Sequence, residues 1–174
     1  MIYVFDVEAD GFLEGVQNIW HVVFKELNSN ITWELTNNGH SSFAAQVYNI
    51  IDTADCLIGH NSIDYDIETI RKILGINYDG LVIDTFVLSS LYDPDLLGGH
   101  SLDAWGNRLG YPKDNFSDFS KPSEELLSRC VRDVEITEKT YEDLVKKLRI
   151  GAPCEIPHVS TGEAWCGVRL GGGS

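Results

Sequence analysis

Basic residues are scarce in this chain of 174 residues. Lysine and arginine together number 13 against 27 aspartates and glutamates, which gives a net charge of −14 at pH 7. Proteins that hold a long nucleic-acid duplex do so mainly through basic side chains on its phosphates. The composition therefore argues against that class. It leaves room for an acidic enzyme whose carboxylates bind metal ions, because those ions supply positive charge locally.

Long apolar runs are also missing. No segment approaches the roughly 20 apolar residues that a membrane span needs. The opening residues, MIYVFDVEADG, have no basic segment of the kind that begins a signal peptide. We therefore expect a soluble, cytoplasmic protein with no membrane partner.

Paired cysteines and common cofactor motifs are absent as well. The four cysteines form no CxxC pair, and Cys56 and Cys130 lie inside apolar segments, where a thiol behaves as a small hydrophobe. Neither a disulfide nor a zinc site is predicted. The sequence contains no GxGxxG or GK[ST] motif, and no serine lies in a nucleophile elbow. His21, inside an apolar strand-like segment, is interpreted as a core histidine.

The remaining composition is that of one ordinary globular domain. Hydrophobic residues make up 43% of the chain, enough for a full core at this length. We expect a folded domain over residues 1–150. Residues 151–174 are rich in glycine and have no clear periodicity, so they are interpreted as a tail without an assigned function.

Hydrophobic periodicity predicts an α/β order of elements. Three antiparallel strands open the chain, a helix and a short buried strand follow, and a long helix closes the folded region. Ser41 or Ser42 is the expected N-cap of the first helix, and Pro122 is expected in the first turn of the last. The predicted strands are 2–9, 18–27, 31–35, 55–59 and 81–86, and the predicted helices are 41–52, 63–75, 101–110 and 122–148.

Four acidic residues adjoin these apolar segments. Asp6 and Glu8 are two apart on the first strand, so their side chains leave the same face. Asp66 is expected in the first turn of a helix, and Asp133 lies in the middle of the last helix, at the margin of its buried stripe. Asp6, Glu8 and Asp66 each have an ordinary structural explanation when taken alone, whereas an aspartate in mid-helix is a poor helix former, which favours a functional or paired role for Asp133. Together the four acids can converge at the strand ends of an α/β sheet. Buried carboxylates that meet in this way need a compensating positive charge, and divalent metal ions are the obvious candidates.

The motifs around these acids resemble those of a known superfamily. The segments DVEADG, GHNSIDYD, VIDTFVLSSLYD, GGHSLDAWGNRLG and RCVRDVEIT are similar to the DEDD (DnaQ-like) 3'-5' exonucleases. The similarity is greatest to the proofreading exonuclease domain of phage family A DNA polymerases, and it runs from Met1 to about Leu148. It implies an RNase H-like fold, with a mixed five-stranded sheet flanked by helices, and a two-metal phosphodiesterase.

The resemblance also assigns roles to residues. It implies that Asp6, Glu8, Asp66 and Asp133 are catalytic and bind two divalent cations, Mg²⁺ or Mn²⁺. The oxygen-only donor set suits these hard cations. Trp105 is interpreted as a core residue; alternatively, Trp105 or Tyr65 stacks on a terminal base. The resemblance matches Asn61 and His100 to family positions, Asn61 near the substrate end. The further candidates for substrate binding are His60, Tyr65 and Arg129.

Arg129 departs from the family pattern. The third motif of the family usually has a tyrosine four residues before its aspartate, or a histidine five before it, and here those positions are Arg129 and Ser128. Arg129 and Asp133 are i and i+4 on one helix, so they can form an ion pair that competes with a metal ion. We therefore expect reduced activity or an unusual dependence on metal, on Mn²⁺ in particular. Alternatively, Arg129 binds the scissile or product phosphate.

The sequence therefore predicts a metal-dependent 3'-5' exonuclease that hydrolyses single-stranded DNA ends to nucleoside 5'-monophosphates. One possible role of this exonuclease is proofreading beside a separate DNA polymerase. If a phage encodes the chain, the expected location is the host cytoplasm. One alternative is a degenerate exonuclease fold that binds nucleic acid or a polymerase without cutting. A second is an oligoribonuclease-like enzyme that trims RNA. The retention of all four acids favours an enzyme, and DNA is favoured over RNA.

Overall fold

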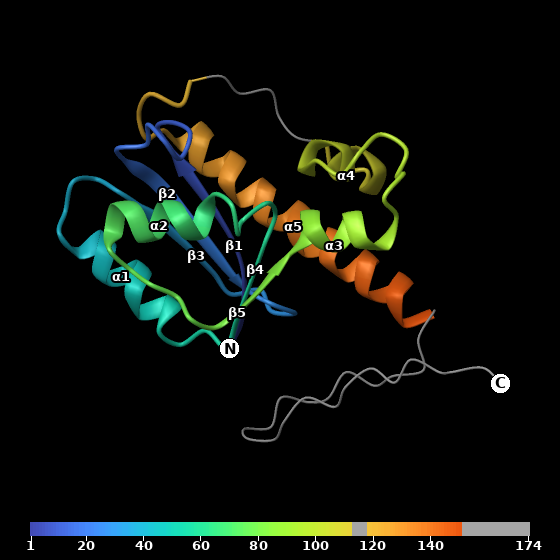
Figure 1. Ribbon diagram of the computed structural model, residues 1–174. Coiled ribbons are helices and arrows are strands. Elements are labelled where there is room, and N and C mark those ends of the chain that lie inside the picture. The colour runs from blue at the N-terminus through green and yellow to red at the C-terminus, as the bar shows by residue number, and fades with distance from the viewer. Residues whose placement is uncertain (113–117, 151–174) are drawn as a thin grey trace.

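A mixed five-stranded sheet forms the centre of the fold (Figure 1). The computed structural model describes residues 1–112 and 118–150. The strand order is β3-β2-β1-β4-β5: the first three strands pair antiparallel, and β4 and β5 continue the sheet parallel to β1. This is the mixed sheet that the resemblance predicted. The strands are β1 (Ile2–Ala9), β2 (Ile19–Glu26), β3 (Thr32–Thr36), β4 (Cys56–Gly59) and β5 (Leu81–Asp84).

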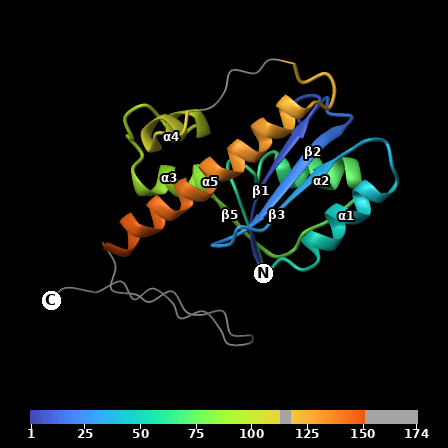
Figure 2. The same ribbon diagram turned by 180° about the vertical axis from the view of Figure 1, so that it is seen from behind.

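Helices cover both faces of this sheet (Figures 1 and 2). α1 (Ser42–Ile51) and α2 (Asp66–Leu74) lie on one face, and the long α5 (Glu124–Ile150) crosses the other. α3 (Thr85–Tyr92) and α4 (Leu102–Leu109) pack on α5 beyond the β5 edge. Within the described residues, no helix is both long and apolar enough to span a membrane.

Successive side chains of the central strand β1 point alternately into two hydrophobic clusters, one on each face of the sheet. Tyr3, Phe5 and Val7 pack in the cluster beneath α1 and α2. Val4 packs on the other face, with Cys130 and Val134 of α5. Because side chains alternate along a strand, Asp6 and Glu8 share the face of Val4 and are directed toward α5.

Local sequence accounts for several helix ends. α2 begins at Asp66, three residues later than predicted, and stops at Gly75, as predicted; the φ of 68° at Gly75 belongs to the left-handed region that glycine adopts without strain. α4 begins after Ser101, whose hydroxyl accepts a hydrogen bond from the backbone N–H of Ala104. Ser41 occupies the N-cap position of α1, but its side chain makes no capping hydrogen bond.

Two of the boundaries that differ from the prediction have a clear local cause. The predicted strand 81–86 ends at Asp84, and the unpredicted helix α3 follows at once, because the Asp84 carboxylate accepts from the backbone N–H of Phe86 and so caps the helix. The last helix begins at Glu124 rather than at Pro122, after Ser123, whose hydroxyl accepts from the Leu126 N–H.

Three residues outside the acidic motifs can be compared with their predictions. Cys56 and Cys130 are buried, free thiols. His21 is buried, as expected for a core histidine, and its Nδ1 lies 3.1 Å from Thr36 Oγ1 on the neighbouring strand. The predicted tail over 151–174 lies outside the described residues.

Candidate active site

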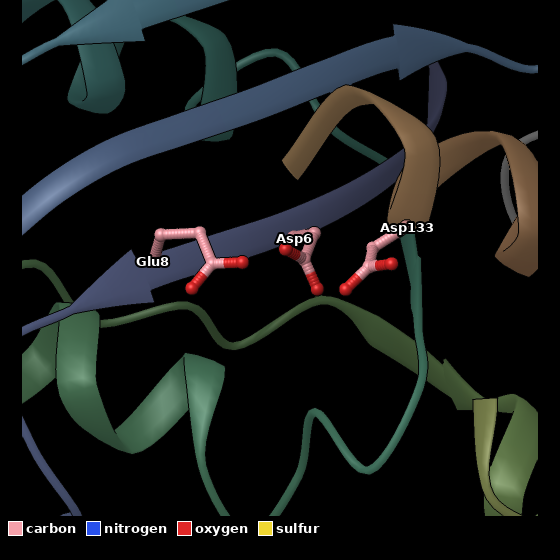
Figure 3. A group of neighbouring side chains, drawn as sticks. All are labelled: Asp6, Glu8 and Asp133. Atoms are coloured by element: carbon pink, nitrogen blue, oxygen red, sulfur yellow. The ribbon is translucent and has the colours of Figure 1, made fainter. Parts of the chain in front are cut away.

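Three of the four predicted acids meet between β1 and α5. Asp6 and Glu8 extend from β1, and Asp133 extends toward them from α5 (Figure 3). One carboxylate oxygen from each side chain lies within 4.8 Å of the other two. Glu8 and Asp133 are buried and Asp6 is half-buried, so their mutual repulsion is poorly screened by water. Three oxygen donors at this spacing form a candidate site for a divalent cation.

Asp66 approaches the same site from the first turn of α2. Its Oδ1 accepts a hydrogen bond of 2.9 Å from the backbone N–H of Val7, between Asp6 and Glu8 on β1. Asp66 lines the same cavity as the other three acids but is not part of the close group of three. Burial raises the pKa of its carboxyl well above the ordinary value, and the charges of Glu8 and Asp84 act in the same direction.

A cavity of about 230 Å³ lies over these four carboxylates. Four of the five residues predicted to contact substrate line it, whereas the fifth, His100, lies outside its wall. We predicted that the four acids meet at strand ends. Asp66 lies after the end of β4, as predicted, but Asp6 lies inside β1. The cavity is lined by Asp6, Val7, Glu8, His60, Asn61, Tyr65, Asp66, Leu102, Arg129 and Asp133.

The loop after β4 is held in one shape by its backbone. A Cβ added to Gly59 would lie 2.4 Å from the Cβ of Ser62, so glycine is required where the strand turns. Asn61 follows with a φ of 56°, a conformation that asparagine tolerates better than most residues. Asp84 accepts hydrogen bonds from the backbone N–H groups of Asn61 (2.8 Å) and Ile63 (3.2 Å). This loop places His60 and Asn61 at the cavity.

Asp84 is therefore a positioning residue that the sequence interpretation missed. Its carboxylate joins the cavity loop to the start of α3, because it accepts from Asn61 and Ile63 as well as from Phe86. The available signal was an aspartate placed immediately before an apolar segment, which is a common N-cap arrangement. That signal was interpreted as part of a strand.

The two aromatic candidates for base stacking differ in position. Tyr65 lines the cavity, and its hydroxyl donates a hydrogen bond of 2.7 Å to the Gly11 carbonyl. Burial, assisted by the Asp66 charge, raises the pKa of Tyr65 to about 12, so the hydroxyl keeps its proton at neutral pH. Trp105 is only 1% exposed, and its Nε1 donates to Ser89 Oγ at 3.0 Å. The proposed stacking role of Trp105 was therefore wrong, because its ring lies in the core.

Arg129 forms ion pairs with two of the clustered acids. Its Nε donates to Glu8 Oε1 at 3.1 Å, and one terminal nitrogen lies 4.0 Å from Asp133 Oδ2. The i, i+4 contact with Asp133 was predicted from the sequence, but the shorter contact is with Glu8 on β1. The guanidinium also lies over the ring of Phe119, 5.5 Å from its centroid. A fixed cation therefore lies at the edge of the acidic cluster.

Cys130 lies on α5 three residues before Asp133, and its thiol contacts Asp6. Its Sγ lies 3.3 Å from Asp6 Oδ2 and 3.5 Å from the Asp6 carbonyl oxygen. Burial raises the pKa of this thiol well above its usual value, and the Asp6 and Glu8 charges raise it further. The thiol therefore stays protonated and donates toward Asp6.

Solved structures with the same fold are nucleases. A nuclease in its apo form superposes with a TM-score of 0.67 at 18% identity, covering 86% of this chain and 74% of the other. Brucella melitensis NrnC bound to pGG gives 0.66 at 14% identity over the same shares of the two chains. Escherichia coli Exonuclease I in complex with a dT13 oligonucleotide gives 0.62 at 12% identity, covering 86% of this chain and 42% of its own. The fold is thus the RNase H-like fold of DEDD-type exonucleases.

Sequence comparison points to phage polymerases. The DNA-directed DNA polymerase of Escherichia phage T7 is 24% identical over 187 residues, and that of Enterobacteria phage T3 is 22% identical over 184 residues. The chain spans about a quarter of the length of these relatives, since each match covers 82% of this chain and 26% of the polymerase. No model of a known protein family matches it. The chain therefore resembles DEDD-type exonucleases in structure and phage DNA polymerases in sequence.

Proposed function

We propose that this chain is a metal-dependent 3'-5' exonuclease that removes nucleoside 5'-monophosphates from single-stranded DNA ends. The observation that carries the proposal is the meeting of Asp6, Glu8 and Asp133 within 4.8 Å, with Asp66 lining the same cavity. Four carboxylates in one cavity repel one another and would repel a phosphodiester. A site of this kind is suited to phosphate chemistry only with bound cations.

The residues fit divalent cations of the Mg²⁺ and Mn²⁺ class. All four donors are carboxylates, and hard cations prefer oxygen ligands. Asp6, Glu8, Asp66 and Asp133 would hold the ions, and Asp66 also accepts a hydrogen bond from the Val7 N–H. Bound there, the ions would acidify the attacking water and stabilise the leaving 3' oxygen. Brucella melitensis NrnC, which shares the fold, has been solved with bound Mg²⁺.

The cavity loop is proposed to hold the strand end. Asn61 is exposed at the cavity, and its backbone is fixed by Asp84, so its amide can donate to a phosphate or sugar oxygen. His60 and Tyr65 flank it in the cavity wall. Nucleic-acid ligands are seen in structures that share this fold, namely dT13 in Exonuclease I and a 5' overhanging duplex in Exonuclease X.

Arg129 is proposed to modulate this site. The guanidinium and a cation bound by Glu8 would repel each other, and both would draw on the negative charge of the same carboxylate. We therefore expect a higher metal requirement than in a site without this arginine, with Mn²⁺ the more effective ion. Once released from Glu8, the guanidinium is placed to bind the scissile or product phosphate.

The second candidate function is a binding module with a retired active site. The Arg129–Glu8 ion pair favours it, because it neutralises part of the acidic cluster without any metal. Trimming of short RNA is a variant of the main proposal, and Brucella melitensis NrnC, which shares the fold, has been solved bound to pGG. The chemistry is the same for both sugars, so DNA and RNA oligomers of one sequence distinguish these variants.

The setting proposed for the enzyme is proofreading. The phage relatives are DNA polymerases, and we propose that residues 1–150 form an exonuclease domain that works beside a DNA polymerase. Such a partner would deliver a frayed 3' end to the cavity.

A time course on 5'-labelled single-stranded DNA tests the proposed activity. Reactions with Mg²⁺, Mn²⁺ or EDTA are compared for the native chain and for Asp6→Ala. A ladder that shortens from the 3' end with either metal, and is absent with EDTA and in the variant, is the expected result. No cleavage with any metal would instead support the binding module.

A further inference from the structure

Three aromatic rings lie in a row beside the cavity. The ring of Phe86 has its centroid 5.8 Å from that of His60 and 5.9 Å from that of His100, with interplanar angles of 84° and 75°. His60 is part of the cavity wall, whereas Phe86 and His100 lie outside it. Phe86 is 38% exposed although it is fully apolar. The row therefore begins at the cavity and continues over the start of α3.

Buried hydroxyl groups hold both histidines of this aromatic row. His60 Nδ1 lies 2.8 Å from Thr85 Oγ1, and Thr85 donates its own proton to the Gly59 carbonyl at 3.1 Å. His60 Nδ1 is therefore the donor to Thr85. On the other side, His100 Nδ1 lies 2.8 Å from Ser89 Oγ. Thr85 and Ser89 are both fully buried, so the two imidazoles are set in place from within α3.

The backbone of the row is fixed as well. Asp84 accepts from the N–H of Phe86 at 2.9 Å and from the N–H of Asn61 at 2.8 Å. One carboxylate thus sets the position of Phe86 relative to the loop that carries His60. The rings are ordered before any ligand arrives, which lowers the entropic cost of binding on them.

We propose that His60, Phe86 and His100 form a stacking site for the bases that precede the 3'-terminal nucleotide of a single DNA strand. This inference rests on the proposed function, because it assumes that the strand end lies at the carboxylates. Aromatic faces bind successive bases with little regard to sequence. With 27 acidic residues against 13 basic, the chain has few cations for phosphate contacts, so stacking is the available source of affinity.

The proposal has two measurable consequences. If the terminal nucleotide lies at the carboxylates and the nucleotide before it lies at His60, a dinucleotide ends before Phe86. Its binding should then not depend on that ring, whereas the binding of a longer strand should. Affinity for the longer strand should also depend only weakly on salt, because phosphate neutralisation contributes little.

The test compares dT2 with dT10 on the full chain. Binding is measured by fluorescence anisotropy with Ca²⁺ in place of Mg²⁺, and hydrolysis is measured separately with Mg²⁺ or Mn²⁺. Phe86→Leu keeps an apolar side chain but removes the aromatic face. We expect it to weaken dT10 binding about tenfold and to leave dT2 binding unchanged. Leu91→Ala, at a residue 75% exposed on the same helix, is the matched control and should change neither.

Each other outcome has a definite meaning. Unchanged dT10 binding by Phe86→Leu, in a native chain that cleaves DNA, overturns the stacking site and leaves the exonuclease proposal intact. Equal losses in Phe86→Leu and Leu91→Ala also overturn it, because the loss would then not be specific to the aromatic ring of Phe86. Phe86-dependent binding without cleavage under any metal supports the stacking site and contradicts the exonuclease.

Discussion

At the scale of single residues, the site depends on side chains that repel one another. Asp6, Glu8 and Asp133 bring three negative charges within a few ångströms in a largely buried place. Arg129 and the Cys130 thiol offset part of that repulsion, the first by charge and the second by a weak hydrogen bond. Such a cluster lowers stability unless it binds something positive.

Removing one carboxylate oxygen from the cluster should abolish hydrolysis. Asp6→Asn keeps the shape of the side chain but removes the negative charge that a metal ligand needs. We therefore expect kcat to fall by at least about 100-fold, the lower end of the loss caused by removing one group that stabilises the transition state. The measurement is single-turnover cleavage of labelled DNA. Asp79→Asn makes the same change at an exposed residue before β5 and should have no effect. Turnover by Asp6→Asn close to the native rate would contradict the two-metal site.

Arg129 can be tested through metal affinity, without reference to activity. Arg129→Gln removes the cation beside Glu8, so we expect Mn²⁺ to bind about tenfold more tightly by titration calorimetry, which corresponds to about 1.4 kcal/mol. Arg132→Gln is the control, because Arg132 lies on the same helix and pairs with Glu135 instead. Weaker binding in Arg129→Gln would show that the arginine organises the acids rather than competing for them.

The family residue can also be restored at this position. If the missing tyrosine is the defect, Arg129→Tyr should raise kcat with Mg²⁺. A lower kcat would instead assign Arg129 a working role, such as phosphate binding. The assay is the rate of removal of the 3'-terminal nucleotide.

At the scale of elements, the junction between β5 and α3 joins two parts of the site. Asp84 is the last residue of β5 and the N-cap of α3, and it also accepts from two N–H groups of the loop after β4. It is 5% exposed, so water cannot easily replace it. The cavity loop and the start of α3 therefore depend on one carboxylate.

Asp84→Ala should destabilise the protein and disturb the cavity loop together. Loss of the cap and of two buried acceptors should lower the free energy of unfolding by about 2 kcal/mol, measured by urea titration. Catalytic efficiency should fall as well, because Asn61 loses its backbone anchor. Asp103→Ala, in the exposed first turn of α4, should cost far less. A stable Asp84→Ala with native activity would contradict the positioning role.

At the scale of the whole molecule, the fold encloses a neutral histidine between its sheet and α5. His21 of β2 is buried, with Thr36 on one side and the Ser123 backbone on the other. Burial lowers its pKa below the ordinary value of 6.5, and the hydrogen bond to the Ser123 backbone opposes this only in part. The folded protein therefore resists taking up a proton that the unfolded chain accepts.

This arrangement predicts a loss of stability toward acidic pH. The pKa of His21 is lower in the folded protein than in the unfolded chain, so stability does not depend on this group above about pH 6.5. Below that pH the unfolded chain takes up the proton first, and the free energy of unfolding falls by at most about 1.4 kcal/mol per pH unit. The measurement is the free energy of unfolding between pH 5 and 8. His21→Gln should flatten this part of the curve, whereas His40→Gln, at an exposed site, should not. A slope unaffected by His21→Gln would assign it to other groups.

The sequence alone predicted the order of the elements apart from α3, which it missed, and it predicted on which elements the acidic residues lie. Alternation along residues 2–9 placed Asp6 and Glu8 on one face, helical spacing placed Asp133 at the edge of a buried stripe, and Gly75 marked the end of α2. These are local properties, set by two backbone periodicities and by the conformational freedom of glycine. The motif resemblance supplied the sheet topology, which local patterns do not contain.

Only the tertiary structure decided what each side chain contacts. Arg129 pairs with Glu8, 121 residues away, more closely than with its helix neighbour Asp133. Trp105 is in the core rather than at the cavity, and Phe86 lies between two histidines from different loops. Asp84 acts on a loop that precedes it by more than 20 residues. Such contacts join elements that are distant in sequence, so they depend on how strands and helices pack and not on any local pattern of residues.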